Sequence, residues 1–107
     1  MIHHPVTDHA VVRYFERVHG IDFDSQFPDA THDGQRLAAI CSYLDIQPSD
    51  ARDMVCPPRL HAGVSLGATL IRAARHRMIC AGGRVVTVVI PTPKMKRRRR
   101  PSLEIAA

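Results

Sequence analysis

The chain has 107 residues, a mass of 11.9 kDa and a formal net charge of +5, which predicts one small domain with a single hydrophobic core. Its 45% of hydrophobic and 23% of charged residues are typical of a folded globular protein, and no apolar stretch approaches the ~20 residues that a membrane-spanning helix needs. The first residues show no secretory signal, and the three cysteines lack the number and spacing of a disulfide framework. We therefore expect a cytoplasmic protein with no membrane partner and with buried thiols at Cys41, Cys56 and Cys80.

The first predicted element is a helix that begins at Thr7 or Asp8 and ends before Gly20. Both starting residues are favourable N-caps, and glycine is favoured just beyond the last turn of a helix. An apolar stripe at helical spacing is expected to face the core, formed by Val11, Tyr14, Phe15 and Val18. The other side carries a polar stripe formed by His9, Arg13, Glu16 and Arg17.

Residues 21–33 are predicted to form an acidic, turn-rich connection. Apolar residues at helical spacing predict a second helix over residues 35–44. A short third helix is predicted to start at Pro48-Ser49-Asp50, with Ser49 as its N-cap, and to stop at Cys56 before the pair Pro57-Pro58. Residues 59–67 are ambiguous and contain at most one helical turn, which would close at Gly67.

Three strands are predicted over residues 69–72, 76–80 and 84–90, and Gly82-Gly83 is typical of a two-residue hairpin turn. A regular hairpin around this turn predicts the pairs Cys80–Val85, Ile79–Val86, Met78–Thr87 and His76–Val89. Thr87 would then share a sheet face with His76. A β-bulge at Ala81 would shift this pairing by one residue.

Helices followed by an antiparallel meander define an α+β fold, with two or three N-terminal helices packed on three strands. We assign this single domain to residues 1–93. Residues 94–107 are highly charged and bounded by proline, and they are predicted to form a disordered basic tail.

Charge is segregated along the chain. Residues 1–57 carry nine acidic residues against four arginines, whereas residues 54–93 contain no Asp or Glu. An acid-free, arginine-rich half that runs into a basic tail predicts a polyanion partner, with RNA favoured over DNA and an acidic protein as the alternative. The strands contain no aromatic residue for base stacking, which favours phosphate contact without sequence reading. The candidate nucleic-acid-binding residues are Arg17, Arg72, Arg75, His76, Arg77, Arg84, Lys94, Lys96, Arg97, Arg98, Arg99 and Arg100.

The polar stripe of the first helix has the residue types that RNA cleavage without a metal requires. That reaction needs a group that takes the proton of the 2′-hydroxyl, a group that protonates the leaving oxygen, and cations at the phosphate. His9 supplies an imidazole beside Arg13 and Arg17, which repel each other unless an anion lies between them. The alternative interpretation is a surface ion pair between Arg13 and Glu16.

The segment Thr7-Asp8-His9-Ala10-x-x-Arg13-x-x-Glu16-Arg17, closed by Gly20-Ile21, resembles small bacterial and phage domains that begin HA-x-x-R-x-x-ER. In those domains a glycine-turned hairpin ends in a VVTV strand, as residues 82–88 do here. Residues 56–68 are similar to their link between helices and sheet. The layout is similar to that of the barnase/EndoU/colicin/RelE-like ribonuclease superfamily, and the resemblance covers roughly residues 7–90. Unlike many members of that superfamily, this chain has no lysine before Lys94.

The resemblance implies a RelE-like, toxin-like RNA-binding domain and, beyond binding, a metal-independent ribonuclease. Its catalytic residues would be His9 as general base or acid, Arg13 at the phosphate and Thr87 through its hydroxyl. The sheet geometry alone adds His76 and Arg77 to the site. The alternatives are a non-catalytic nucleic-acid-binding module and a phage-encoded structural or interaction protein, and an antitoxin is a further candidate partner.

No cofactor and no metal site are predicted. The pair His3-His4 together with His9 could hold a metal, but these residues lack a supporting carboxylate. His32 and His61 stand alone in loop-like sequence and are expected to be solvated. The chain also contains no phosphate-binding loop and no dinucleotide fingerprint.

Overall fold

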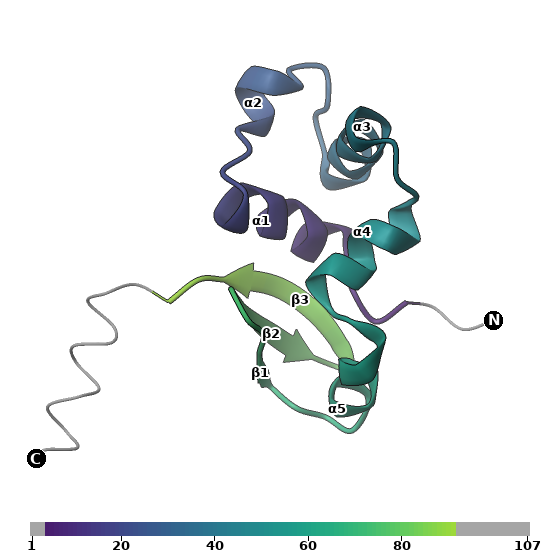
Figure 1. Ribbon diagram of the computed structural model, residues 1–107, viewed down its shortest axis with the longest axis vertical. Helices are drawn as coiled ribbons and strands as arrows, with labels where there is room; N and C mark the ends of the chain where they lie inside the picture. The colour runs from purple at the N-terminus through teal and green to yellow at the C-terminus, as the bar shows by residue number, and fades with distance from the viewer. Residues whose placement is uncertain (1–3, 92–107) are drawn as a thin grey trace, which may run out of the picture.

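The computed structural model describes residues 4–91. Within this range, helices precede a three-stranded antiparallel sheet of order β1-β2-β3, which confirms the α+β class (Figure 1). The elements are α1 (Asp8–Val18), α2 (Phe23–Gln26), α3 (Asp33–Leu44), α4 (Pro48–Val55), the 3-10 turn η1 (Pro58–Leu60), α5 (His61–Ser65), β1 (Leu70–Arg72), β2 (Arg77–Ala81) and β3 (Arg84–Val89). The basic tail over residues 94–107 lies outside the described residues.

Helix α1 begins at a predicted N-cap, because Thr7 Oγ1 accepts a hydrogen bond from the Ala10 backbone N–H at 3.2 Å. Its buried face is broader than the predicted stripe: it includes Ala10 and Val12, whereas Val18 is only partly buried. The reason is that α1 lies between β3 on one side and α3 and α4 on the other (Figure 1). A helix that is covered on two sides buries more than one stripe of side chains.

The remaining helices depart from the sequence prediction mainly at their ends. Helix α3 begins at Asp33 because the His32 side chain caps it, so that His32 is exposed but not isolated. Helix α2 forms inside the predicted connection and places Phe23 in the core. Helix α4 begins at Pro48, within the predicted start, but its N-cap is Gln47 and not Ser49. The ambiguous segment over residues 59–67 contains the end of η1 and all of α5.

The hairpin turn at Gly82-Gly83 is confirmed, since both glycines have positive φ angles, 61° and 75°. The predicted pair Cys80–Val85 is also confirmed. Beyond it the predicted register is wrong, because Val86 is an extra residue in β3, and the observed pairs are Ile79–Thr87, Met78–Val88 and Arg77–Val89.

The bulge at Val86 has a physical reason in the core. Val85 and Val88 are both fully buried although they lie three residues apart, and regular alternation would place them on opposite faces. One extra residue between them lets both side chains face the core. Val85 is also held by the N-terminal segment, since its N–H donates to the Pro5 carbonyl at 2.7 Å and Val6 bridges to it in parallel.

The sheet therefore has an inner face that packs on the helices and an outer face that looks away from them. Ile71, Met78, Cys80, Val85 and Val88 point inward, where they are buried or partly buried. By strand alternation and the observed register, the outer face consists of Leu70, Arg72, Arg77, Ile79, Arg84, Thr87 and Val89. Thr87 is thus on the opposite face from Met78, which corrects the predicted placement beside His76.

The hydrophobic core extends from Val6 to Val88 and includes the three cysteines, which are free and buried as predicted. Burial raises the pKa of the Cys56 thiol to about 11, so that this side chain behaves as a small apolar residue. Among residues 4–91, no helix combines the length and the apolar character needed to cross a membrane.

Candidate functional site

Three of the four arginines in residues 1–57 are paired with an acid, whereas the arginines of the acid-free half are not paired within residues 4–91. Arg13 pairs with Glu16 at 2.6 Å, Arg36 pairs with Asp24 at 3.4 Å, and Arg52 pairs with Asp8. In the described part of the chain, no ion pair involves any of the five arginines of the acid-free half, Arg59, Arg72, Arg75, Arg77 and Arg84. The arginines of the acid-free half therefore lack acidic neighbours in the described structure as well as in the sequence.

Three of these unpaired arginines lie on the outer face of the sheet. Arg72 and Arg77 are direct cross-strand partners, and Arg84 follows the hairpin turn opposite Ala81. Like charges directly opposite each other in a sheet are destabilising. An anion on this face relieves that repulsion, and Thr87 supplies a hydroxyl there as well.

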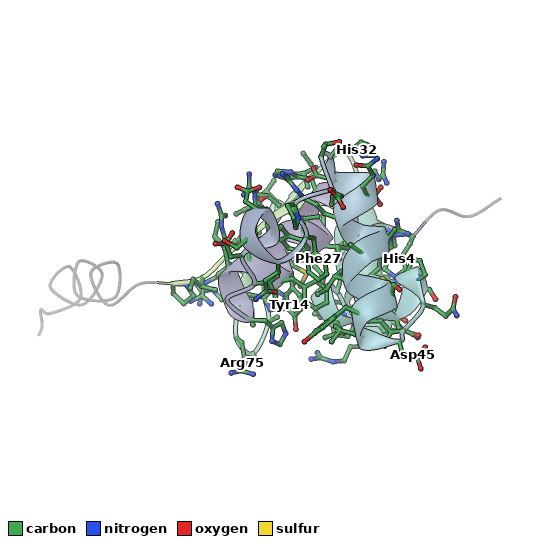
Figure 2. The ribbon with its side chains drawn as sticks, turned by 90° about the horizontal axis from the view of Figure 1, so that it is seen from above. His4, Tyr14, Phe27, His32, Asp45 and Arg75 are labelled. Carbon is green, nitrogen blue, oxygen red and sulfur yellow. The ribbon has the colours of Figure 1, made fainter. Side chains whose placement is uncertain are left out.

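Arg75 and His76 lie apart from the outer face, in the loop between β1 and β2. Arg75 is exposed and lies on the same side of the molecule as Tyr14 (Figure 2). Both residues line a small cavity of about 170 Å³, together with His76 and Arg59.

His76, which the sequence analysis places among the nucleic-acid-binding residues, has its side chain buried in the core. His76 is 5% exposed, its Nε2–H donates to the Val55 carbonyl at 2.8 Å, and its ring packs edge-on against Tyr14 at 5.0 Å. Burial lowers the pKa of His76, although the hydrogen bond to Val55 opposes this shift. The neutral ring fastens α4 to the β1–β2 loop.

The structure brings His9 and Arg13 together and adds a carboxylate that the sequence did not indicate. His9 Nδ1 lies 3.0 Å from Asp33 Oδ2, and Arg13 Nε lies 3.4 Å from His9 Nε2. Because an arginine Nε–H only donates, His9 Nε2 is the acceptor and the ring proton is on Nδ1, where it is donated to Asp33. His9 is 42% exposed, so that Nε2 presents its lone pair beside a guanidinium at the surface.

Thr87 and Arg17 do not complete this arrangement. The bulge at Val86 turns Thr87 to the outer face, away from the helices, so that the predicted cluster of His9, Arg13 and Thr87 is not assembled. Arg17 NH1 donates to the Val88 carbonyl at 2.7 Å and fastens the end of α1 to β3. This contact places Arg17 close to the end of β3, because Val88 is the second-last residue of that strand.

Two sets of polar residues were missed by reading the sequence. The sequence analysis placed Asp33 in a connection, whereas in the structure it is the first residue of α3. His61 is not isolated, since it lies with His4 and Asp53 in one cluster built from three separate segments. No local spacing connects these residues, because the chain folds between them.

No protein-family model, curated protein or solved structure matches this chain. The candidate sites are defined by geometry: the outer face with its unpaired arginines, and the pair formed by His9 and Asp33.

Proposed function

We propose that this protein binds single-stranded RNA through phosphate contacts on the outer face of its sheet, with Arg72, Arg77 and Arg84 as the principal contacts. The observation that carries this proposal is the segregation of ion pairs. Three of the four arginines of α1, α3 and α4 are paired with Asp or Glu and the fourth, Arg17, donates to a backbone carbonyl, whereas those of the sheet have no acidic partner among residues 4–91. Unpaired guanidiniums held at fixed positions by strands form a phosphate-binding surface.

The chemistry of the outer face favours binding that does not read sequence. Its other side chains are aliphatic or carry a hydroxyl, and among them are Leu70, Ile79 and Thr87. None offers an aromatic ring for base stacking, so affinity comes from charge, and the basic tail over residues 94–107 adds six cations to it. RNA is favoured over DNA by the resemblance of residues 7–90 to RelE-like ribonucleases.

Replacing both Arg72 and Arg77 with alanine tests this proposal. Each phosphate contact in a single strand contributes about 0.7 to the slope of log binding constant against log salt, so the double variant should lose about 1.4 in slope. Binding of fluorescent oligo(U) should weaken at every salt concentration. Arg36→Ala is the matched control, because Arg36 is already paired with Asp24.

The proposal fails if the double variant and the Arg36→Ala variant show the same slope and affinity as the wild type. Binding to an acidic protein but to neither RNA nor DNA would support the alternative of an interaction module. DNA of the same length serves as a second ligand, and equal affinity for both would remove the preference for RNA.

Metal-independent RNA cleavage is a second candidate function, favoured by the contact between His9 and Asp33. In this reaction His9 Nε2 takes the proton of the 2′-hydroxyl, the 2′-oxygen bonds to phosphorus, and the bond to the 5′-oxygen breaks as that oxygen takes a proton from water. Asp33 keeps the ring proton on Nδ1 and orients the imidazole. Arg13 is placed to contact the phosphate once it leaves Glu16 and His9, and its departure frees the Nε2 lone pair that takes the proton.

The proposed setting is the cytoplasm, where RNA is available and where free thiols such as Cys41, Cys56 and Cys80 persist. An antitoxin-like or other acidic protein could occupy the same outer face as RNA. Such a partner would compete with RNA rather than bind beside it, because both would need the same arginines.

A further inference from the structure

A cluster of two imidazoles and one carboxylate lies where the N-terminal segment meets α4 and α5. His4 comes from the segment that leads to the Val6 bridge, Asp53 from α4, and His61 is the first residue of α5. One potential ligand atom of each side chain lies within 4.8 Å of the other two. The three residues therefore converge although 49 residues separate His4 from Asp53.

The distances within the cluster match a small coordination sphere. His4 Nε2 lies 2.8 Å from Asp53 Oδ1, and His61 Nε2 lies 4.0 Å from the same oxygen. Ligand bonds of 2.0–2.2 Å in a tetrahedral site place neighbouring ligand atoms about 3.3–3.6 Å apart. The two separations from Asp53 lie on either side of this range, and the two histidine ligand atoms lie within 4.8 Å of each other.

The surroundings hold the two imidazoles at the site. His61 Nε2 also lies 3.0 Å from the Cys56 carbonyl, so an ion that binds this nitrogen would replace that contact. The His4 and His61 rings pack edge-on at 4.7 Å. The side chains of His4 and His61 are 19% and 30% exposed, so that an ion there would be partly shielded from water yet reachable.

We propose that His4, Asp53 and His61 form a binding site for a divalent ion of the zinc class, with a fourth position open to water. Two imidazoles and one carboxylate are a donor set that Zn²⁺ uses in three-ligand sites, whereas Mg²⁺ and Ca²⁺ require oxygen donors. The site is separate from the outer face and from His9, and it is independent of RNA binding.

An ion at this site would fasten the N-terminal segment to the helices. His4 lies two residues before Val6, whose bridge covers the edge of β3 at Val85. Zn²⁺ is therefore expected to raise the melting temperature of the wild type, because a ligand that binds only the folded state stabilises it. Affinity should fall in acid, since an imidazole must be deprotonated to bind the ion.

The test is a Zn²⁺ titration of the EDTA-treated, buffer-exchanged full chain by isothermal calorimetry, with Mg²⁺ as a parallel arm. We expect one Zn²⁺ per chain and no binding of Mg²⁺. Each of His4→Ala, Asp53→Asn and His61→Ala should weaken Zn²⁺ binding at least about tenfold, because even the loss of an outer contact costs about 10–100-fold. His9→Ala is the matched control, since His9 also lies beside a carboxylate, Asp33, at 3.0 Å.

A measurement on the wild type covers the case in which a variant fails to fold. Co²⁺ added to the full chain should produce visible absorption bands and should broaden the imidazole NMR signals of His4 and His61 while those of His9 stay sharp. The proposal is overturned if Asp53→Asn and His61→Ala bind Zn²⁺ as the wild type does. It is equally overturned if the Co²⁺ broadening misses His61 and falls on other histidines.

Discussion

Deletion of residues 94–107 is expected to weaken binding of oligo(U) RNA by about 100-fold at low salt and to flatten its salt dependence. The segment contains six of the fifteen Lys and Arg residues and a single acid, Glu104. At about 0.7 per phosphate contact, loss of all six cations removes up to about 4 from the slope of log binding constant against log salt. Fluorescence anisotropy at a series of salt concentrations measures both quantities.

The folded domain should be unaffected by this deletion, because residues 94–107 show no apolar periodicity of the kind that a core element has. Equal thermal melting of the full and shortened chains checks this. A full-length control with the six cations replaced by serine separates charge from chain length, and it should bind RNA as weakly as the deletion does. Unchanged affinity in both variants would contradict a role for the tail in RNA binding.

Replacement of His9 with alanine is expected to reduce RNA cleavage by about 100-fold or more, the usual effect of losing a general acid or base. Asp33→Asn should also slow cleavage, because an amide does not hold the Nδ1 proton of His9 as a carboxylate does. Neither change removes an outer-face arginine, so RNA binding should stay within about twofold of the wild type. Cleavage of several RNAs is measured with EDTA present.

The control for His9→Ala is His19→Ala, which removes an exposed imidazole at the opposite end of α1, where it contacts the Tyr14 hydroxyl and no carboxylate. This variant should cleave RNA as the wild type does. Equal cleavage by the wild type and His9→Ala, or cleavage by neither, would remove His9 from a catalytic role and leave RNA binding as the function of the chain.

The sequence was sufficient where one local pattern decides the structure. The stripe containing Val11 and Phe15 located α1, and Gly82-Gly83 located the hairpin, because helical periodicity and positive φ angles are properties of neighbouring residues. The charge segregation likewise located the arginines of the sheet. None of these features depends on how distant segments pack.

The sequence was insufficient where packing between distant segments decides. The bulge at Val86 exists because Val85 and Val88 both face the core, and this placed Thr87 on the other side of the sheet. His76 looks like a strand-face residue until its contact with the Val55 carbonyl is known. Asp33 reaches His9 across 24 residues, and such a contact follows from how α1 and α3 pack rather than from any local spacing.

The central claim is that RNA lies on the outer face of the sheet, and amide chemical-shift mapping of the full chain with oligo(U) tests it most directly. The largest shifts are predicted at Arg72, Arg77 and Arg84 and their strand neighbours, with little change around Asp24 and Asp29 in the acidic helical part. Shifts confined to the helices, or the absence of any shift on the three strands at saturating RNA, would contradict the account.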